Sequence, residues 1–299
     1  MKKLVYIATA ALMCSGLLFT SCKKKETEDN DTEGGRDHAL AETCSNDMVN
    51  IGMQASYGQG SFNGSSATYK GNDDWNIYNS CAILDFDSLN NTDADTLTVD
   101  FGMACAGKDG RTRKGILMFI YTAGKHYRDS GNVITVATPG NTYFVDNNQV
   151  IVNSKTISNM GHVTNGYLTW VINSDIKINR SNSNTVTWTA TKTKVLLAGE
   201  MPNNQPIDWP HAKVGIFGTA SGTHTKSGGS SNGFTVTIQQ SKWLVRDFTC
   251  GTSSRFFVQG VMEFTPSGKP VREINFGTGN CDNQATVTIN GHVYNVTLH

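Results

Sequence analysis

The stretch Thr185-Val186-Thr187-Trp188-Thr189-Ala190-Thr191 alternates strictly between threonine and apolar residues. Successive side chains of a strand point to opposite faces, so Val186, Trp188 and Ala190 share one face and the threonines share the other. This pattern predicts a half-buried strand of an antiparallel sheet. The alternation slips near Val195-Leu196-Leu197, which indicates a bulge or a strand that leaves the sheet edge.

The last two strands of the chain form a predicted hairpin whose register follows from its turn. Asn290-Gly291 is a favoured pair for a two-residue type I′ turn. If Ile289 pairs with His292, the apolar residues gather on one face, whereas a slip of one residue mixes both faces. The resulting face carries Ala285, Val287, Ile289, Tyr294, Val296 and Leu298, with Val287 opposite Tyr294 and Ala285 opposite Val296.

Short apolar segments with the same period of two follow one another from about residue 62 onward. Most links between them are short, and short links join antiparallel neighbours rather than parallel strands. We therefore predict an all-β fold, an antiparallel meander of hairpins that forms a twisted sheet or a sandwich. The other predicted strands are Ala82–Phe86, Thr96–Phe101, Ile116–Thr122, Val133–Ala137, Tyr143–Val145, Gln149–Val152, Tyr167–Ile172, Asp175–Ile178, Val214–Gly218, Phe234–Gln239, Phe256–Phe264 and Val271–Phe276.

One segment before the strands has a helical period instead. Its apolar residues recur at steps of three and four and share one helix face, namely Leu40, Cys44, Met48, Ile51 and Ala55. The pattern predicts a single N-terminal helix over about residues 37–56, with Asp37 as its N-cap. We expect this helix to pack over one end of the sheet, with docking of a partner as the alternative.

Composition limits the classes of function. Of the 299 residues, 17% are charged, and 25 basic residues balance 25 acidic ones. A chain with no basic excess lacks the electrostatic attraction that binds nucleic acid. Beyond the N-terminus no stretch of about 18 apolar residues occurs, so no membrane-spanning helix is predicted.

The N-terminus has the three-part layout of a secretory signal. A basic start at Lys2 and Lys3 precedes an apolar run, and the small pair Thr20-Ser21 precedes Cys22. This ending resembles a bacterial lipoprotein signal, which implies a diacylglycerol thioether on Cys22 and membrane attachment through that lipid. The predicted divisions are a signal peptide at 1–21, a disordered tether at 22–36, a helix and linker at 37–60, and an antiparallel β domain at 61–299.

An exported domain meets oxidising conditions, so its cysteines are expected to pair. The segment Val99-Asp100-Phe101-Gly102 before Cys105 is echoed by Ile274-Asn275-Phe276-Gly277 before Cys281, and another cysteine precedes each segment. Among the three ways of pairing four cysteines, the echo selects Cys81–Cys105 and Cys250–Cys281. Cys44 is left over, on the apolar face of the predicted helix.

Catalytic patterns are weak in this sequence. Gly229-Ser230-Ser231-Asn232-Gly233 fits the G-x-S-x-G pattern, but a nucleophile elbow needs a strand before it and a helix after it. Here a Gly/Ser loop precedes the pattern and a predicted strand follows it. No C-x-x-C spacing indicates a zinc site, and we expect neither catalytic residues nor a cofactor.

Two binding hypotheses rest on local clusters. Asp85, Asp87, Asp93 and Asp95 supply oxygen ligands of the kind that Ca²⁺ prefers, although an EF-hand order is absent and an acidic hairpin tip is the simpler interpretation.

In the proline-rich Met201–Pro210 segment, Trp209 and Asp208 could form a platform for a glycan. Carboxylates that could serve glycoside cleavage in a general sense are Glu200, Asp208, Glu263 and Glu273.

Three further segments together resemble an uncharacterised family of β-rich lipoproteins of Bacteroidetes. They are Gly110–Gly115, Tyr143–Val150, and Asn275–Gly277 continuing through Cys281-Asp282-Asn283 to the final hairpin. The resemblance covers about residues 37–299 and implies an outer-membrane location, on either the periplasmic or the cell-surface face. It implies no activity and no functional residues.

These observations favour a lipid-anchored cell-envelope protein with a binding or structural role, without catalytic activity, such as a component of an outer-membrane assembly. The alternatives are a glycan-binding or glycan-processing module that uses the Met201–Pro210 loop, and a calcium-stabilised surface adhesin. The expected partners are the membrane, through the lipid, and envelope proteins or glycans.

Overall fold

The computed structural model describes residues 33–55, 67–68, 81–86, 93–107, 110–202, 207–250 and 257–298. The chain divides into two units, residues 1–31 and 32–299, and the described residues all belong to the second. Cys22, the signal peptide and most of the predicted tether therefore lie outside the described residues. No helix within the described ranges has the length and hydropathy needed to span a membrane.

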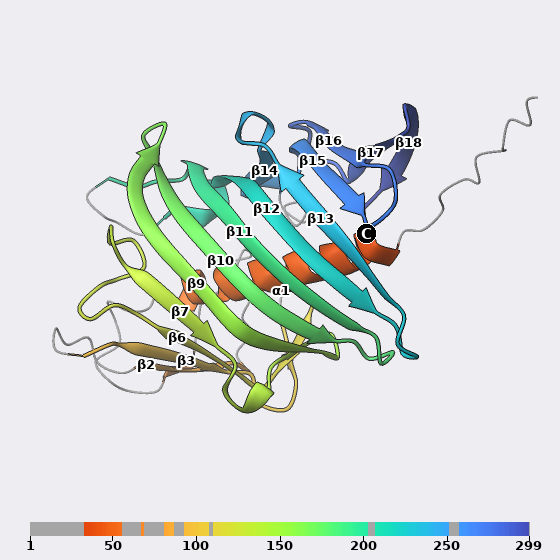
Figure 1. Ribbon diagram of the computed structural model, residues 1–299. Coiled ribbons are helices and arrows are strands. Elements are labelled where there is room, and N and C mark those ends of the chain that lie inside the picture. Colours follow the sequence, from red (N-terminus) through yellow and green to blue (C-terminus); the bar gives the residue numbers. More distant parts are fainter. Residues whose placement is uncertain are drawn as a thin grey trace, which may run out of the picture. The chain divides into compact units, whose positions relative to one another are not determined.

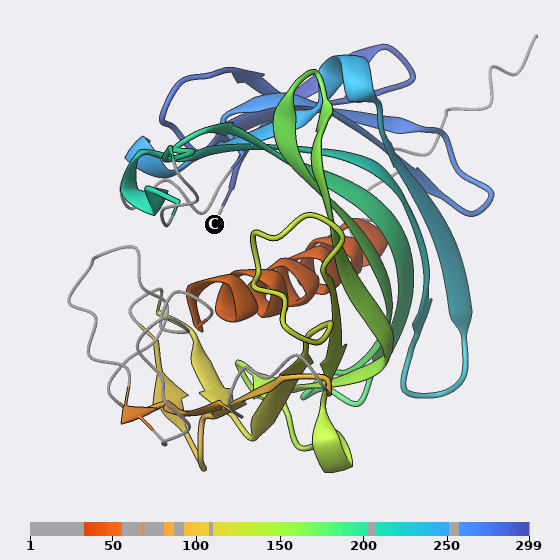
Figure 2. The same ribbon diagram turned by 90° about the vertical axis from the view of Figure 1, so that its left-hand side faces the viewer.

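Helix α1 (Glu33–Ala55) lies on the concave side of the long strands (Figure 2). It contacts four neighbouring strands, β10 to β13. Its predicted apolar face is buried, with Cys44, Met48, Ile51 and Ala55 at 0% exposure and Leu40 partly buried against the core. The helix is thus packed along the sheet rather than over one end of it.

The predicted start of the helix is wrong. α1 begins at Glu33, so Asp37 is not its N-cap and residues 33–36 belong to the helix rather than to the tether. The physical reason is that Asp37 faces the sheet, where its carboxylate binds Arg180 and contacts the His224 imidazole. The first turn also packs closely on the sheet, since a Cβ at Gly34 would lie 3.3 Å from the ring of Phe264.

All pairings between the described strands are antiparallel, as predicted, and they form one sheet. Most of the strands join in succession along it (Figure 1). In that order they are β1 (Ala67–Thr68), β2 (Ile83–Phe86), β3 (Thr96–Asp100), β6 (Ile116–Ile120), β7 (Val133–Ala137), β9 (Asn148–Thr164), β10 (Tyr167–Asn179), β11 (Thr185–Ala198), β12 (Lys213–Thr225), β13 (Ser231–Ile238), β15 (Gln259–Pro266), β16 (Arg272–Thr278), β17 (Gln284–Ile289) and β18 (His292–Thr297). Short strands β4 (Cys105–Ala106), β5 (Thr112–Lys114) and β8 (Phe144–Val145) link to β9, and β14 (Leu244–Asp247) pairs with β12 and β15.

Strand β11 has the predicted buried and exposed faces. On β11 the side chains of Val186, Trp188 and Ala190 are buried, while Thr187 and Thr189 are exposed. The expected irregularity is present as a register shift between Leu196 and Ala198.

The final hairpin has the predicted register. Ile289 pairs with His292, Val287 with Tyr294 and Ala285 with Val296. Asn290 and Gly291 have φ angles of 49° and 80°, as a type I′ turn requires at both central positions.

Strands β9 and β10 run for 17 and 13 residues, longer than the short segments predicted. Their inner faces carry polar residues, among them Lys155, Asn159 and Ser174, all buried. These residues interrupt the apolar alternation, which is why the sequence pattern divided each strand or ended it early.

Both predicted disulfides are present, Cys81–Cys105 and Cys250–Cys281, and Cys44 is a buried free thiol. The echoed segments also fold alike. The Gly102 amide donates to Oδ1 of Asp100 at 2.8 Å, and the Gly277 amide donates to Oδ1 of Asn275 at 2.9 Å. Each glycine has a positive φ, so the same turn ends both strands before the cysteine.

Candidate functional site

On the concave side of the sheet, charged pairs join α1 to the strands. The Arg113 guanidinium donates two hydrogen bonds to Asp47, at 2.5 and 2.9 Å, and the Tyr143 hydroxyl donates a third at 3.0 Å. Burial raises the pKa of Asp47, but the Arg113 charge and these hydrogen bonds outweigh it and hold the pKa below its usual value. The carboxylate is therefore ionised and neutralises the buried guanidinium.

A second pair joins the helix to β11. Glu42 Oε2 lies 3.5 Å from Lys192 Nζ, and Glu42 also accepts a hydrogen bond from the Asn46 amide at 3.2 Å. Burial raises the pKa of Glu42, but Lys192 and His38 lower it by more, so that the pKa lies below its ordinary value. The pKa of His38 itself is lowered to about 4, first by burial, so this imidazole is neutral at pH 7.

A lysine with two serine neighbours forms the third contact. Lys155 Nζ donates to Ser45 Oγ at 2.7 Å and to Ser174 Oγ at 2.8 Å, and burial lowers the Lys155 pKa to about 7. A serine beside an amine of this kind is a nucleophile–base arrangement in some enzymes. Here, however, the three residues are only 1–6% exposed, and they lie between α1 and the strands β9 and β10. We interpret this cluster as part of the helix–sheet contact.

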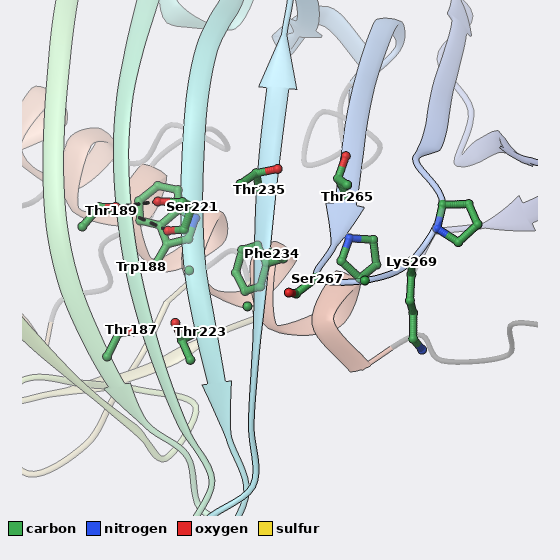
Figure 3. Close-up of a pocket in the computed structure, with 15 residues that line it drawn as sticks. Thr187, Trp188, Thr189, Ser221, Thr223, Phe234, Thr235, Thr265, Ser267 and Lys269 are labelled. Atoms are coloured by element: carbon green, nitrogen blue, oxygen red, sulfur yellow. Dashed lines mark hydrogen bonds between the residues drawn. The ribbon is translucent and has the colours of Figure 1, made fainter.

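The outer face of the same strands carries a groove (Figure 3). Its volume is about 650 Å³, and it is lined by Thr187, Trp188, Thr189, Ser221, Gly222, Thr223, Gly233, Phe234, Thr235, Thr265, Pro266, Ser267, Gly268, Lys269 and Pro270. A second hollow of about 530 Å³ adjoins it and shares Thr189, Ser221 and Thr235. Together they follow the exposed side of β11, β12 and β13, and the first also reaches β15 and the turn after it.

Hydroxyl side chains form a regular array across this face. In register, Thr189 pairs with Ser221, which pairs with Thr235, which pairs with Thr265. The residues of this hydroxyl array are Thr187, Thr189, Thr191, Thr219, Ser221, Thr223, Thr235, Thr237 and Thr265. The array arises because outward positions of β11 and β12 carry Thr or Ser at every second residue, and because β13 and β15 add Thr235, Thr237 and Thr265 beside them.

Gly233 makes the hollow in this array. It occupies the outward position next to Thr223 in the register, where its neighbours carry hydroxyl side chains. A Cβ at Gly233 would lie 3.8 Å from the Gly222 carbonyl oxygen and 3.9 Å from Ser267 Cβ, which are ordinary contact distances. The absence of a side chain at Gly233 therefore leaves an open space, although a Cβ would fit there without a close backbone contact.

The groove offers many hydrogen-bonding groups and little charge. None of the residues that line the first groove is an acid, a histidine or a cysteine, and its single cation is Lys269. General acid–base or nucleophilic catalysis needs such groups in reach of the ligand. Hydroxyls both donate and accept hydrogen bonds, so this face can bind a polar ligand without transforming it.

The predicted glycan platform lies elsewhere. Asp208, just before the turn η3 (Trp209–His211), contacts His211 Nδ1 through Oδ2 at 2.8 Å, and the Trp209 side chain is outside the described set. Glu200 binds Arg128 at 3.0 Å and His162 at 2.9 Å. Neither Asp208 nor Glu200 lines the two hollows on the outer face.

Of the other candidate carboxylates, Glu263 and Glu273 face each other in the β15–β16 register. Glu263 also accepts a hydrogen bond from the Gln239 amide at 3.2 Å. The strand register thus places the two glutamates side by side, but neither lines the groove or the second hollow.

The four predicted calcium ligands do not all lie in the described part of the chain. Asp87 is outside it, Asp85 and Asp93 are exposed, and Asp95 is buried. Asp95 Oδ2 accepts a hydrogen bond from the Gly124 amide at 3.2 Å, so it supports a neighbouring turn. Among the residues that the structure describes, no three His, Cys, Asp or Glu side chains are grouped to hold a metal ion.

The G-x-S-x-G segment forms the turn between β12 and β13. The Lys226 amide donates to the Ser230 carbonyl at 2.9 Å, and Ser231 already belongs to β13. The segment thus lacks the strand–turn–helix context of a nucleophile elbow, as the sequence pattern indicated.

Sequence reasoning found one row of the hydroxyl array, on β11, but not the surface as a whole. The alternating Thr and Ser of Thr219–Thr225 and the pair Thr235 and Thr237 were the available signals. Comparisons with known proteins add no further candidate, because no family model, no curated protein and no solved structure matches this chain.

Proposed function

We propose that this chain is a lipid-anchored binding protein of the outer membrane, without catalytic activity, and that the groove on its outer sheet face holds the ligand. The observation that carries this proposal is a preformed groove lined by hydroxyls and free of acidic, histidine and cysteine side chains. The charged pairs that fix α1 on the concave side support it, because they leave the outer face as the accessible surface.

The lipid anchor is supported by the signal that ends at Cys22. Several acyl chains on one cysteine would hold the protein firmly at a membrane, since each buried CH₂ contributes about 0.8 kcal/mol. A polar segment, KKKETEDNDTEGG at residues 23–35, then separates the lipid from most of the folded unit.

The anchor is tested by metabolic labelling with an alkyne palmitate, followed by membrane fractionation. The wild-type chain is expected to incorporate the label and to fractionate with the outer membrane. Cys22→Ser should lose both properties, whereas Cys14→Ser, a matched change within the signal, should keep them. Unlabelled wild-type protein, or equal labelling of Cys22→Ser, would contradict the proposal.

A further inference from the structure

We propose that the hydroxyl array is a binding site for a neutral polysaccharide chain. This inference rests on the proposed binding role and specifies its ligand. It places the ligand on β11, β12, β13 and β15, away from the Met201–Pro210 segment.

The charge of the lining residues favours an uncharged ligand. Across both hollows the side chains are hydroxyls, one amide, glycines and apolar groups, with Lys269 as the single charged residue. A nucleic acid or a phosphorylated chain requires several Arg or Lys contacts. An ordinary cationic ligand would need carboxylates, and none lines either hollow.

The backbone arrangement argues against an extended peptide. Peptides that bind sheets pair with a free edge strand, whereas β12 and β13 already have strand partners on both sides. A peptide would otherwise need an apolar pocket for an anchor side chain. The large apolar residues of the groove do not offer one, because Trp188 and Phe234 are only 1% and 4% exposed.

The periodicity of the array suits a ligand with a repeating unit. Neighbouring strands lie about 4.8 Å apart, and outward residues of one strand recur at about 6.7 Å. Thr189 Oγ1 and Ser221 Oγ lie 3.0 Å apart in a hydrogen bond that Figure 3 shows on the face of the sheet. This bond uses one of the pair's two O–H donors and one of its four acceptor lone pairs, so three lone pairs and one donor remain, the Ser221 carbonyl oxygen lying 3.5 Å from Thr189 Oγ1.

The threonines also make this surface rigid. A β-branched side chain has few accessible χ1 rotamers in a strand, so the hydroxyls are ordered before a ligand arrives and little side-chain entropy is lost on binding. Their methyl groups and the exposed ring of Pro270 supply apolar contacts for the C–H faces of sugar rings. The hydroxyl groups and the apolar C–H faces of a sugar can thus both contact complementary groups of the protein.

The test is a depletion assay with the full-length protein in detergent. It is mixed with five insoluble or immobilised neutral polysaccharides (starch, dextran, β-1,3-glucan, cellulose and chitin) and with two anionic ones (alginate and polygalacturonate). We expect the protein to be retained on at least one neutral polysaccharide. We do not expect retention on the anionic polysaccharides alone.

Two groove variants and one control locate the site. Gly233→Leu should reduce retention more than tenfold, because the new side chain enters the hollow at a position where φ is not positive and a Cβ meets nothing closer than 3.8 Å. Thr189→Val keeps the shape and removes one hydroxyl, so a loss of about two- to tenfold is expected. Thr135→Val changes an exposed threonine on β7 and should leave retention unchanged.

The inference is overturned if none of the five neutral polysaccharides retains the protein, if only the anionic ones do, or if Gly233→Leu is retained like wild type. Circular dichroism of each variant confirms that it is folded. Because Cys22→Ser should still bind polysaccharide, a failure of the anchor proposal is distinguishable from a failure of this one.

Discussion

At the scale of single residues, the buried Asp47–Arg113 pair should contribute to the free energy of unfolding. Arg113 is 1% exposed, and Asp47→Ala removes a buried carboxylate that accepts two hydrogen bonds from its guanidinium. Asp47→Ala should therefore lower the free energy of unfolding by about 3–5 kcal/mol, measured by urea denaturation with the disulfides intact. Asp175→Ala is the matched control, because Asp175 is half-exposed and bonds one amide. A change below about 1 kcal/mol for Asp47→Ala would show that the pair does not hold α1.

Lys155 should make stability depend on pH. Its pKa is lowered by burial to about 7 in the folded protein, against about 10.4 in an unfolded chain. Between these values the unfolded state binds more protons, so this residue makes the free energy of unfolding rise with pH. Lys194, whose pKa is also lowered to about 7 by burial, contributes in the same direction. Above about pH 8.5 the raised pKa of the Cys44 thiol opposes this rise.

The corresponding variant is Lys155→Met. It removes the buried amine, and Ser45 and Ser174 can still bond each other across 3.2 Å. We expect a gain of roughly 1–2 kcal/mol at pH 7 and a shallower rise between pH 7 and 8.5, both from urea denaturation. A loss of stability at pH 7 together with an unchanged slope would mean that burial does not lower the pKa of Lys155.

At the scale of elements, the packing of α1 against β6 depends on Gly52. A Cβ at this position would lie 2.5 Å from the ring of Phe119 on β6, which explains a glycine inside an otherwise helical pattern. Gly52→Ala should cost about 1–3 kcal/mol from overpacking, reduced by the better helix propensity of alanine.

Gly35 is the matched control in the same helix. No atom lies within 4 Å of a Cβ added there, so Gly35→Ala should be neutral or stabilise by up to about 1 kcal/mol. Thermal unfolding of both variants tests the contact. Equal effects of the two substitutions would contradict the packing of Phe119 against Gly52.

Some elements could be predicted because two local signals agreed. In the final hairpin the Asn290-Gly291 turn and the apolar alternation specify the same register. The disulfide pairing followed from the repeated Asx-Phe-Gly turn before Cys105 and Cys281, a feature of the chain itself.

Other features depend on contacts that no local pattern encodes. Lys155 and Lys192 interrupt an alternating strand and look like solvent-facing residues, yet both are buried against the helix. Asp37 has the residue type of an N-cap, but its carboxylate is bound by Arg180, the residue after the end of β10. The hydroxyl array likewise appears only when the cross-strand register brings Thr189, Ser221 and Thr235 side by side.

At the scale of the folded unit, the two faces of the long strands differ in chemistry. The concave face carries cations whose charges are met by acids of α1, as in Arg113 with Asp47 and Lys192 with Glu42. The outer face carries hydroxyls and an open groove. Buried charges on the concave side therefore hold the helix, while the groove on the outer face has Lys269 as its single charged residue. This contrast is the central physical basis of the proposed binding role.

The measurement that tests this account most directly is photo-crosslinking in intact cells, with p-benzoylphenylalanine at Ser267, an exposed residue of the groove, or at Thr135 on β7. Benzophenone inserts into C–H bonds of sugars and proteins alike, so the result does not depend on the class of ligand. We expect a crosslinked species of higher mass from position 267 and none from position 135. Crosslinks from position 135 alone, or none from either, would contradict it.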